Sequence, residues 1–352
     1  MDRREWLGRL SISRHAFGRY DRIANWLKLL GGYSPFPLNI DLVLTLRCNL
    51  ACRMCNLRQE EYRRLFSGFR EPELSTGEWL EIIDDIRRSF HFRPNVNLLG
   101  GEPSLYEGYL EIAAYAKQRG FRCTYTTNGT FLARDARAIV SSGVDVVVVS
   151  IDGEREIHDY IRRAGSYDRA IEGIQKINKL KTDQGKPSPQ IFLACAISGD
   201  NVGHLVHVID LAKDLGVAYV VYFHLQFPDR QIKLHHIDPG AMKREIAQVT
   251  AKARSYKISV SFYPALRDDQ IAGYYLDSCD ALPSGCISPW LRMAIMPDGS
   301  IVPCRDFVMG NARTGVENLG QVWNSRQFRS FRRRLARFGA SAECGRCCRR
   351  QY

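Results

Sequence analysis

Short apolar runs alternate with segments of helical spacing along most of the chain. The runs cover residues 38–46, 96–99, 122–127, 144–151, 191–197 and 217–225. Each is followed by a segment in which apolar positions recur at helical spacing, near 76–90, 106–119, 132–142, 168–180, 201–215 and 240–256. Six successive strand–helix units predict an α/β fold with a parallel sheet and right-handed crossovers.

The predicted strands place a functional site at one edge of the sheet. The run VDVVVVS over 144–150 is almost wholly apolar, as expected for a strand covered on both faces. Glycines in LLGGEP, TTNGT and SIDGE come just after strands, at the carboxyl ends where parallel α/β sheets bind ligands. A curved six-unit barrel and a flat doubly wound sheet both fit this pattern. The stretch 181–190 is expected to be an exposed loop within the same domain.

Residues 1–37 follow a different pattern. Their aromatic and aliphatic side chains can be laid on helical faces among basic side chains, namely Arg3, Arg4, Arg9, Arg14, Arg19, Arg22 and Lys28. A basic amphipathic extension of this kind suits an anionic surface or a membrane interface. The alternative is a basic helix that caps the barrel.

Composition limits the class of protein. The 352-residue chain has 45% hydrophobic and 25% charged residues, which is typical of a globular protein and excludes disordered and fibrous classes. The 50 Lys and Arg against 38 Asp and Glu give a net charge of +12. No apolar run reaches the ~18–20 residues that cross a bilayer, and the N-terminus lacks a signal-peptide stretch. We therefore expect a cytoplasmic protein, with peripheral membrane association as a further option.

The 11 cysteines are the unusual feature of the composition. In a cytoplasmic chain of this length, cysteines are more often metal ligands or catalysts than members of a disulfide framework. Most of them form two groups, one near the N-terminus (Cys48, Cys52 and Cys55) and one near the C-terminus (Cys286, Cys304, Cys344, Cys347 and Cys348), while Cys123, Cys195 and Cys279 are scattered.

The first group follows the first predicted strand with the spacing Cys48-x3-Cys52-x2-Cys55. A structural zinc site would want a fourth Cys or His ligand, and none follows before His91. Three thiolates suit a [4Fe–4S] cluster with one iron left open, because the open iron can chelate a small molecule.

This spacing resembles the hallmark of the radical S-adenosylmethionine (SAM) superfamily, in the loop after the first strand of a partial (β/α)6 TIM-like barrel. The resemblance implies that the open iron binds the amino and carboxylate groups of SAM. An electron from the cluster then breaks a sulfur–carbon bond, and the 5′-deoxyadenosyl radical abstracts a hydrogen atom from the substrate. It also implies an electron donor such as flavodoxin or ferredoxin. The cofactor supplies the difficult chemistry and the protein positions it.

A second motif supports the resemblance. Gly100, Gly101, Glu102 and Pro103 end the second predicted strand and look like the family's GGEP motif, which borders the amino group of SAM. A carboxylate there can accept from an ammonium group, and glycines let the backbone approach closely.

The stretch SIDGEREIHDYIRR resembles the segment after the fourth strand in family members with auxiliary clusters. The resemblance implies that Ser150 reaches polar groups of SAM and that Arg162 pairs with its carboxylate. Arg163 is an alternative to Arg162, and a solvated helix face is the other interpretation of either arginine. His158 is expected to cap or pack its helix.

Two further positions complete the expected SAM site. Asn128 in TTNG, at the end of the third strand, is a candidate for contact with the ribose hydroxyls. Met54 takes the position that is often aromatic in the family and packs near the adenine, a role that an adaptable thioether can fill.

The C-terminal cysteines predict a second metal centre. Cys286 and Cys304 flank two short β-like runs joined by Asp298-Gly299, which predicts a hairpin. A basic helical stretch over 323–338 then leads to Cys344-x2-Cys347. Two pairs make four ligands, which also describes a zinc ribbon.

This region resembles the SPASM/twitch extensions of radical SAM enzymes. Because the later cysteines of a full SPASM domain are missing, the resemblance implies the shorter twitch form, a β-hairpin plus helix with one auxiliary [4Fe–4S] cluster. Its ligands would be Cys286, Cys304, Cys344 and Cys347, with Cys348 as an alternative to Cys347. We expect an extension over 1–37, the barrel over 38–230, a connecting helical region over 231–278 and the twitch domain over 279–352.

Of the remaining cysteines, Cys279 is a candidate hydrogen-atom donor to a substrate radical, whereas Cys123 and Cys195 are expected to be small buried hydrophobes. The fully ligated auxiliary cluster would accept or relay an electron, which favours oxidation or another C–H rearrangement of a small molecule. Epimerisation and crosslinking of a ribosomal peptide are alternatives; about 37 residues before the barrel are few for a leader-recognition domain. The substrate could be anionic or lipid-linked. A zinc-dependent nucleic-acid-binding protein is the alternative outside the enzymes, but the GGEP motif would then have no function. We therefore expect no binding of nucleic acid.

Overall fold

The computed structural model describes residues 31–55, 57, 72–225, 237–276, 286–304, 307–314 and 318–339. The basic segment before residue 31, Cys279 and the cysteines at 344, 347 and 348 lie outside these ranges, so the predictions made for them are not tested by the structure. Among the described helices, none is long and apolar enough to cross a membrane.

In the described part of the chain, a single sheet has the strand order β10-β9-β8-β1-β2-β3-β4-β5-β6-β7. The predicted strands are present as β1 (Asn39–Val43), β2 (Asn95–Leu99), β3 (Cys123–Thr127), β4 (Val146–Ser150), β5 (Gln190–Ile197) and β6 (Tyr219–His224). Neighbours from β1 to β7 pair in parallel. Since the spatial order follows the sequence, without the reversal of a doubly wound sheet, the curved barrel is confirmed.

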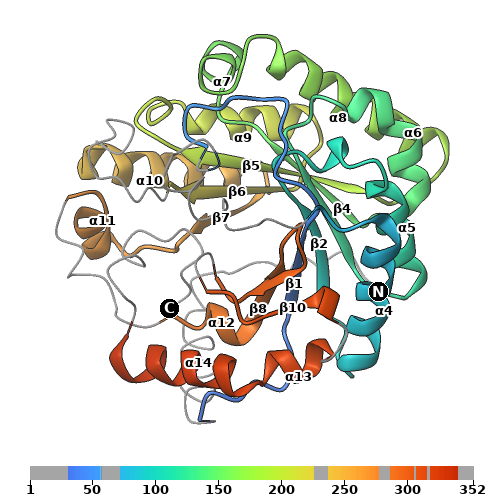
Figure 1. Cartoon of the computed structure of the whole chain (residues 1–352). Coiled ribbons are helices and arrows are strands. Elements are labelled where there is room, and N and C mark those ends of the chain that lie inside the picture. Colours follow the sequence, from blue (N-terminus) through green and yellow to red (C-terminus); the bar gives the residue numbers. More distant parts are fainter. Residues whose placement is uncertain are drawn as a thin grey trace.

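The helices lie on the outside of the curved sheet (Figure 1). They are α4 (Thr76–Ser89), α5 (Tyr109–Gln118), α6 (Leu132–Ser142), α7 (Arg155–Ile161), α8 (Ser166–Asp183), α9 (Leu205–Asp214), α10 (Pro239–Ser255) and α11 (Asp268–Tyr275). A capping box between Ser75 and Glu78 begins α4. The predicted loop over 181–190 is exposed over most of its length, although α8 extends into it.

The two faces of the sheet differ in character. Outward positions such as Ile40, Leu42 and Leu98 are fully buried in the main core beneath the helices. Inward positions of β4 to β7 form a separate apolar cluster that consists of Val146, Phe192, Ala194, Tyr219 and Val221, with half-buried Val148, Phe223 and Tyr263 packed against it. The interior of the barrel therefore has an apolar wall on the β4–β7 side.

The opposite inner wall is polar. Asp41 on β1 is buried and accepts hydrogen bonds from Asn97 on β2 at 2.9 Å and from Arg292 on β8 at 2.5 Å. Two residues earlier on each strand, Asn95 donates to its register partner Asn39. Apolar and polar walls thus face a common interior.

One strand of the barrel was not predicted. Residues 231–278 contain α10 and α11, as expected of a helical region, but also β7 (Ser259–Tyr263), which pairs in parallel with β6. Serines at 259 and 261 interrupt the apolar character of this run, and the strong helical pattern just before it obscured the signal. The parallel sheet therefore continues beyond residue 230.

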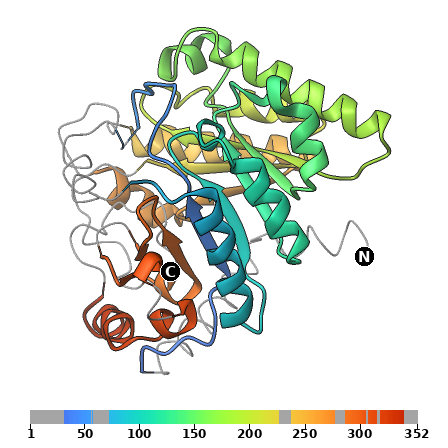
Figure 2. The same cartoon turned by 45° about the vertical axis from the view of Figure 1, so that its right-hand side comes forward.

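The predicted C-terminal hairpin is present and extends the same sheet (Figure 2). It consists of β8 (Arg292–Ile295) and β9 (Ser300–Val302), with Gly299 at φ +86° in the turn, and it is preceded by the short helix α12 (Ser288–Leu291). Then follow β10 (Gly310–Asn311), two single-turn elements over Ala312–Thr314 and α13 (Leu319–Trp323), and α14 (Arg326–Phe338). Because β8 pairs in parallel with β1, the C-terminal unit and the barrel share one sheet.

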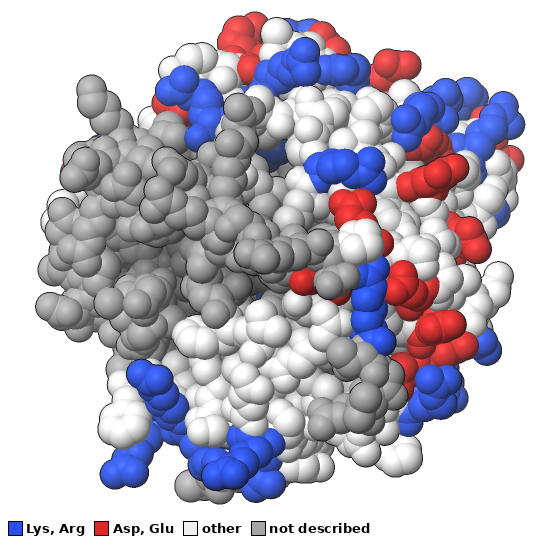
Figure 3. Space-filling view, viewed as in Figure 1, with Lys and Arg blue, Asp and Glu red and all other residues white. Residues whose placement is uncertain are grey.

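A buried arginine anchors the C-terminal unit to the start of the described chain. The Arg332 guanidinium donates to the carbonyl oxygens of Pro289 at 2.9 Å and Gly32 at 3.1 Å, and it lies over the ring of Trp323. The Trp323 indole in turn donates to the Ser34 carbonyl. Five arginines of α14 are exposed, namely Arg326, Arg329, Arg333, Arg334 and Arg337. Basic side chains gather along the lower edge of the molecule in Figure 3, where α14 lies in the same view.

Candidate functional site

The first cysteine group lies in the loop after β1, as predicted. Within the described ranges, Cys48, Cys52 and Cys55 are thiols outside any disulfide. The pKa of the Cys52 thiol is raised to about 11, chiefly by burial; Asp152, Cys55 and Cys48 add to the rise and Arg162 opposes it, which shows that the three sulfurs lie near one another. Thiols in such surroundings are held as thiolates by a bound cation. This donor set therefore fits three irons of a cluster.

Two hydrogen-bond donors face the sulfur of Cys48. The Leu50 amide lies 3.4 Å from Sγ, and the Asn128 side-chain amide lies 4.0 Å from it. The same amide also donates to Asn49 Oδ1 at 2.9 Å, while Asn128 Oδ1 accepts from the backbone and hydroxyl of Thr130. Donors to sulfur are a common means of stabilising cluster thiolates. Asn128 thus contacts the cysteine loop, and its contact with ribose stays a prediction.

The glycines of GGEP bring two loops together. The Gly101 amide donates to the Thr45 carbonyl and the Glu102 amide to the Arg47 carbonyl, each at 2.8 Å. A Cβ at Gly100 would lie 2.6 Å from the Thr45 oxygen, and one at Gly101 would lie 2.3 Å from the Arg47 oxygen. Only glycine permits this approach. The close contact is with the chain that enters the cysteine loop.

The Glu102 carboxylate is fully buried and accepts five hydrogen bonds from the protein. Oε1 accepts from the Ser104 amide and hydroxyl, from the Tyr125 hydroxyl and from the Thr127 hydroxyl. Oε2 accepts from the Asn128 amide at 2.7 Å. A carboxylate has about four lone-pair sites. Glu102 therefore orders the carboxyl ends of β2 and β3. Its predicted contact with SAM would add the ammonium group as a further donor to this carboxylate.

Pro103 begins a single 3-10 turn, Pro103–Leu105, whose N-terminus is capped by the Glu102 side chain. Ser150 is the last residue of β4, half-buried and on the inner face, and it pairs with Ala194. Met54 is buried beside Leu50 and Cys52. These positions all belong to the same end of the barrel as the cysteine loop.

Arg162 lies between a buried carboxylate and a cysteine of the first group. Its Nε donates to Asp152 Oδ2 at 2.6 Å, and its Nη1 lies 4.0 Å from Cys52 Sγ. Burial lowers the pKa of Arg162, but the charges of Asp152 and Cys52 raise it more, so the guanidinium stays charged. Asp152 is thus a protein partner of Arg162, and the expected contact of Arg162 with the SAM carboxylate stays a prediction. Arg163 is exposed and donates to the Asn49 carbonyl at 3.3 Å.

Asp152 is the site residue that the sequence reasoning missed. Its second oxygen accepts from the Ala196 amide at 2.9 Å, so the carboxylate joins the ends of β4 and β5. The signal was the aspartate of SIDGE, which directly follows the strand. His158 is fully buried, accepts from the Asp152 amide and has a pKa lowered to about 4 by burial, in agreement with the expected packing role.

The hairpin carries the two described cysteines of the second group. Cys286 precedes α12 and Cys304 follows β9, both half-buried. The antiparallel register returns the chain after β9 to the end of the hairpin at which β8 begins. By contrast, Cys123 and Cys195 are fully buried in the main core, where burial raises the pKa of each thiol, to about 12 for Cys123. These two behave as small hydrophobes.

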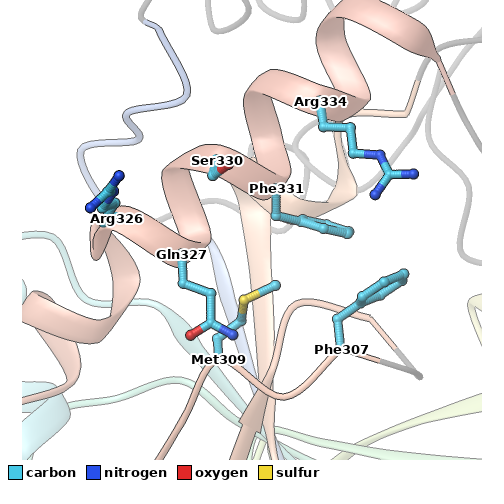
Figure 4. A pocket seen from close by; sticks show the side chains of 7 residues that line it. All are labelled: Phe307, Met309, Arg326, Gln327, Ser330, Phe331 and Arg334. Atoms are coloured by element: carbon cyan, nitrogen blue, oxygen red, sulfur yellow. The ribbon is translucent and has the colours of Figure 1, made fainter.

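A cavity of about 520 Å³ lies between α14 and the segment 307–309 (Figure 4). The rings of Phe307 and Phe331 face each other at 4.8 Å, with Met309 beside them and Arg334 on the same side of the helix. None of the residues predicted for the SAM site lines it. The cavity thus belongs to the C-terminal unit.

Comparison with known proteins gives two family matches. Residues 42–212 match the family model described as the radical SAM superfamily, and residues 286–348 match the SPASM model, described as an iron–sulfur cluster-binding domain. The first match contains Cys48, Cys52 and Cys55, and the second contains all the C-terminal cysteines.

Relatives of similar sequence include a mycofactocin maturase MftC of Mycobacterium ulcerans, 28% identical over 88% of this chain and 80% of its own length. An AdoMet-dependent heme synthase of Methanosarcina barkeri is 26% identical over 84% of this chain and 85% of its own. An Fe-coproporphyrin III synthase of the same organism is 30% identical over 63% of this chain. The matched region spans about half the length of that last relative, 52%.

Solved structures share the fold. SuiB of Streptococcus suis bound to S-adenosylmethionine has a TM-score of 0.67 at 17% identity, covering 89% of this chain and 72% of its own. The protein anSMEcpe with bound AdoMet has a TM-score of 0.61 at 15% identity, covering 89% and 88%. Both structures resemble this chain in backbone fold over 89% of its length.

Proposed function

Because this chain belongs to the radical SAM superfamily and carries a SPASM iron–sulfur domain, we propose that it oxidises an unactivated C–H position of a small molecule. A SAM-binding [4Fe–4S] cluster and an auxiliary iron–sulfur cluster are its cofactors. The proposal rests on the two cysteine groups of the sequence, one of three cysteines in the radical SAM region and one within the SPASM region. A dehydrogenation needs both a radical generator and an acceptor for the second electron.

In this proposal the first cluster, when bound, supplies the electron that cleaves SAM to a 5′-deoxyadenosyl radical. Cys48, Cys52 and Cys55 hold three of its irons. Asp152 keeps the Arg162 guanidinium beside Cys52, where a positive charge stabilises thiolate. The remaining polar side chains orient the loop.

The predicted SAM contacts of Gly100, Gly101, Pro103, Ser150, Asn128 and Met54 belong to the same proposal, since all lie at the carboxyl end of the barrel. Cys286 and Cys304, with Cys344 and Cys347, are the proposed ligands of the auxiliary cluster. The Cys279 thiol keeps its proposed role as a hydrogen-atom donor only if the reaction is an epimerisation.

The interior of the barrel supports a substrate with both apolar and polar surface. The wall of β4–β7 offers half-buried Val148, Phe223 and Tyr263. The facing wall offers Asn97, held by Asp41, and Arg292, whose side chain is 22% exposed. A small anionic molecule with an apolar body would match both walls.

The relatives supply a second candidate. The mycofactocin maturase and the heme synthase match most of this chain at similar identity, so maturation of a peptide and heme synthesis are two further candidate activities. The first would use a peptide substrate, and the second a small anionic substrate of the kind proposed here.

Anaerobic reconstitution tests the radical chemistry. The holoenzyme should be brown and, with dithionite and SAM, release 5′-deoxyadenosine. The variant Cys48→Ala/Cys52→Ala/Cys55→Ala should release none and keep the auxiliary cluster. The variant Cys286→Ala/Cys304→Ala should still cleave SAM but lose substrate turnover. A colourless zinc protein, or cleavage by the first variant, would contradict the proposal.

The class of substrate can be measured separately. Extracts of cells grown in D2O are divided by dialysis into small molecules and peptides, and each fraction is incubated with the holoenzyme. Deuterium in 5′-deoxyadenosine from the dialysable fraction alone supports the small-molecule proposal. Deuterium from the retained fraction alone would favour peptide modification.

A further inference from the structure

A cluster of two histidines and one glutamate, with no cysteine among its members, lies at the carboxyl ends of β4 and β5. Glu154 is the residue before α7, His204 is the residue before α9, and His207 lies in the first turn of α9. One nitrogen of each ring and one carboxylate oxygen lie within 4.8 Å of one another. Two loops separated by about 50 residues in sequence therefore bring these side chains together.

The contacts within the cluster are short. Glu154 Oε1 lies 2.5 Å from His204 Nδ1, and Oε2 lies 3.3 Å from His207 Nδ1. The two imidazole rings are stacked with their centroids 6.0 Å apart. All three side chains are partly exposed, so an ion can reach them from solvent.

Ordinary helix capping does not account for this arrangement. Glu154 and His204 occupy the N-cap positions of α7 and α9, yet neither makes a side-chain capping hydrogen bond. Within the described residues, Glu154 Oε2 is buried and lacks a hydrogen-bond partner of good geometry. A buried carboxylate oxygen without a partner is unfavourable, and a cation between it and the imidazoles would satisfy it.

We propose that Glu154, His204 and His207 bind a divalent metal ion of the zinc class. Two histidines and a carboxylate are an established ligand set for Zn²⁺, with the fourth position left to water. Bonds of about 2.1 Å imply donor atoms roughly 3.4 Å apart in a tetrahedral site. The 3.3 Å between Oε2 and His207 Nδ1 matches this spacing. Oε1, now 2.5 Å from His204 Nδ1, would have to move away from this nitrogen for both side chains to bind the ion.

The position gives the ion a structural consequence. Glu154 follows Asp152, the partner of Arg162, by two residues. On the other loop, Asp200 pairs with Arg53 of the cysteine loop at 3.1 Å. An ion held by Glu154 and His204 would therefore fasten two of the loops that surround the first cysteine group. None of its ligands is shared with either iron–sulfur cluster, so the inference is independent of the proposed reaction.

The test uses holoenzyme with both clusters assembled and their iron measured. Equilibrium dialysis against Zn²⁺ should give one zinc per chain beyond the iron. The variants His204→Ala, His207→Ala and Glu154→Gln should each weaken zinc binding at least tenfold. The exposed His91 provides a matched control, because His91→Ala should leave zinc binding unchanged. Equal binding by the wild type and the His207→Ala variant would overturn the inference.

Zinc K-edge absorption distinguishes this site from the cysteines. The bound ion should show nitrogen and oxygen neighbours, including imidazole, and no sulfur. Sulfur in the coordination shell would mean that zinc has entered a cluster site, and it would refute the assignment. Zinc should also raise the thermal midpoint of the wild type but not of the His204→Ala/His207→Ala variant, while both release 5′-deoxyadenosine, which shows that the variant is folded.

Discussion

Replacing Glu102 by Gln removes one charge from the buried network at the carboxyl ends of β2 and β3. The carboxylate accepts five donors, four on Oε1 and one on Oε2. Glutamine has one acceptor oxygen. If that oxygen takes the place of Oε1, the new NH2 group takes the place of Oε2, which lies 2.7 Å from the Asn128 backbone nitrogen, so two donors face each other. If the side chain is flipped, the Ser104 amide loses its acceptor instead.

Either orientation leaves one buried N–H without a partner, at about 1–3 kcal/mol, and weakens the remaining bonds because they no longer reach a charged acceptor. We expect a total loss of about 2–4 kcal/mol in the local stability of this network. With 1.36 kcal/mol per factor of ten, this corresponds to roughly a 30- to 900-fold faster exchange of the amides that it protects.

Hydrogen exchange with mass spectrometry measures this directly, on peptides that cover residues 96–105 and 123–130. Glu107→Gln is the matched control, since Glu107 is exposed five residues away. In Glu102→Gln, both the protection of these amides from exchange and the affinity of the holoenzyme for SAM should fall. Both should be unchanged in the control. Unchanged exchange with a loss of SAM affinity would refute the positioning role and would instead support direct contact between Glu102 and SAM.

Further predictions concern other parts of the same end of the barrel. Asp152→Asn leaves the buried Arg162 charge unpaired, so the free energy of unfolding should fall by about 3–5 kcal/mol, and adding Arg162→Met should recover most of this loss. Thermal midpoints of the single and double variants measure the effect. Losses of stability that simply add in the double variant would contradict the prediction. Gly101→Ala should displace the Arg47 carbonyl, whose oxygen lies only 2.3 Å from the position of the new Cβ. Iron incorporation at the first cluster, measured as iron per chain, should therefore fall. A full iron content would contradict the importance of this close packing. Burial lowers the pKa of His224 from 6.5 to about 3, so the unfolded chain binds a proton first, and stability present above pH 6.5 is lost as the pH falls toward 3. The loss should be about 1.4 kcal/mol per pH unit, and His224→Phe should remove that part of the pH dependence of the thermal midpoint; an unchanged slope would show that His224 is already protonated or not buried.

The strands that could be predicted are those whose signal is local. Runs such as 144–151 are continuous and apolar because both faces of the strand are buried. In the helices that flank them, apolar residues recur clearly at helical spacing. The strand β7 was missed because its serines weaken the alternation that identifies a half-buried strand. The pairing of β8 with β1 could not be derived, since it joins strands from opposite ends of the chain, such as Asn39 with Arg292, and depends on how the whole sheet curves.

The same distinction applies to the site. The spacing of Cys48, Cys52 and Cys55 is local, so the sequence identifies it. The partners of Glu102 and Arg162 come from other strands and loops, and only the structure brings Thr127 to the first and Asp152 to the second. The glutamate–histidine cluster has no sequence pattern of its own, because its ligands belong to loops that follow different strands.

The parallel pairing of β8 with β1 has a consequence for the order in which the protein can be built. On the ribosome, β1 is made early and finds β2 soon afterwards, but its other edge stays open until residues 292–295 have been synthesised. Contacts at this separation form slowly, since a long loop must close before they give any stability. An open edge of this kind is also prone to pair with another chain. Nascent chains of this protein should therefore depend on chaperones until the hairpin closes the sheet.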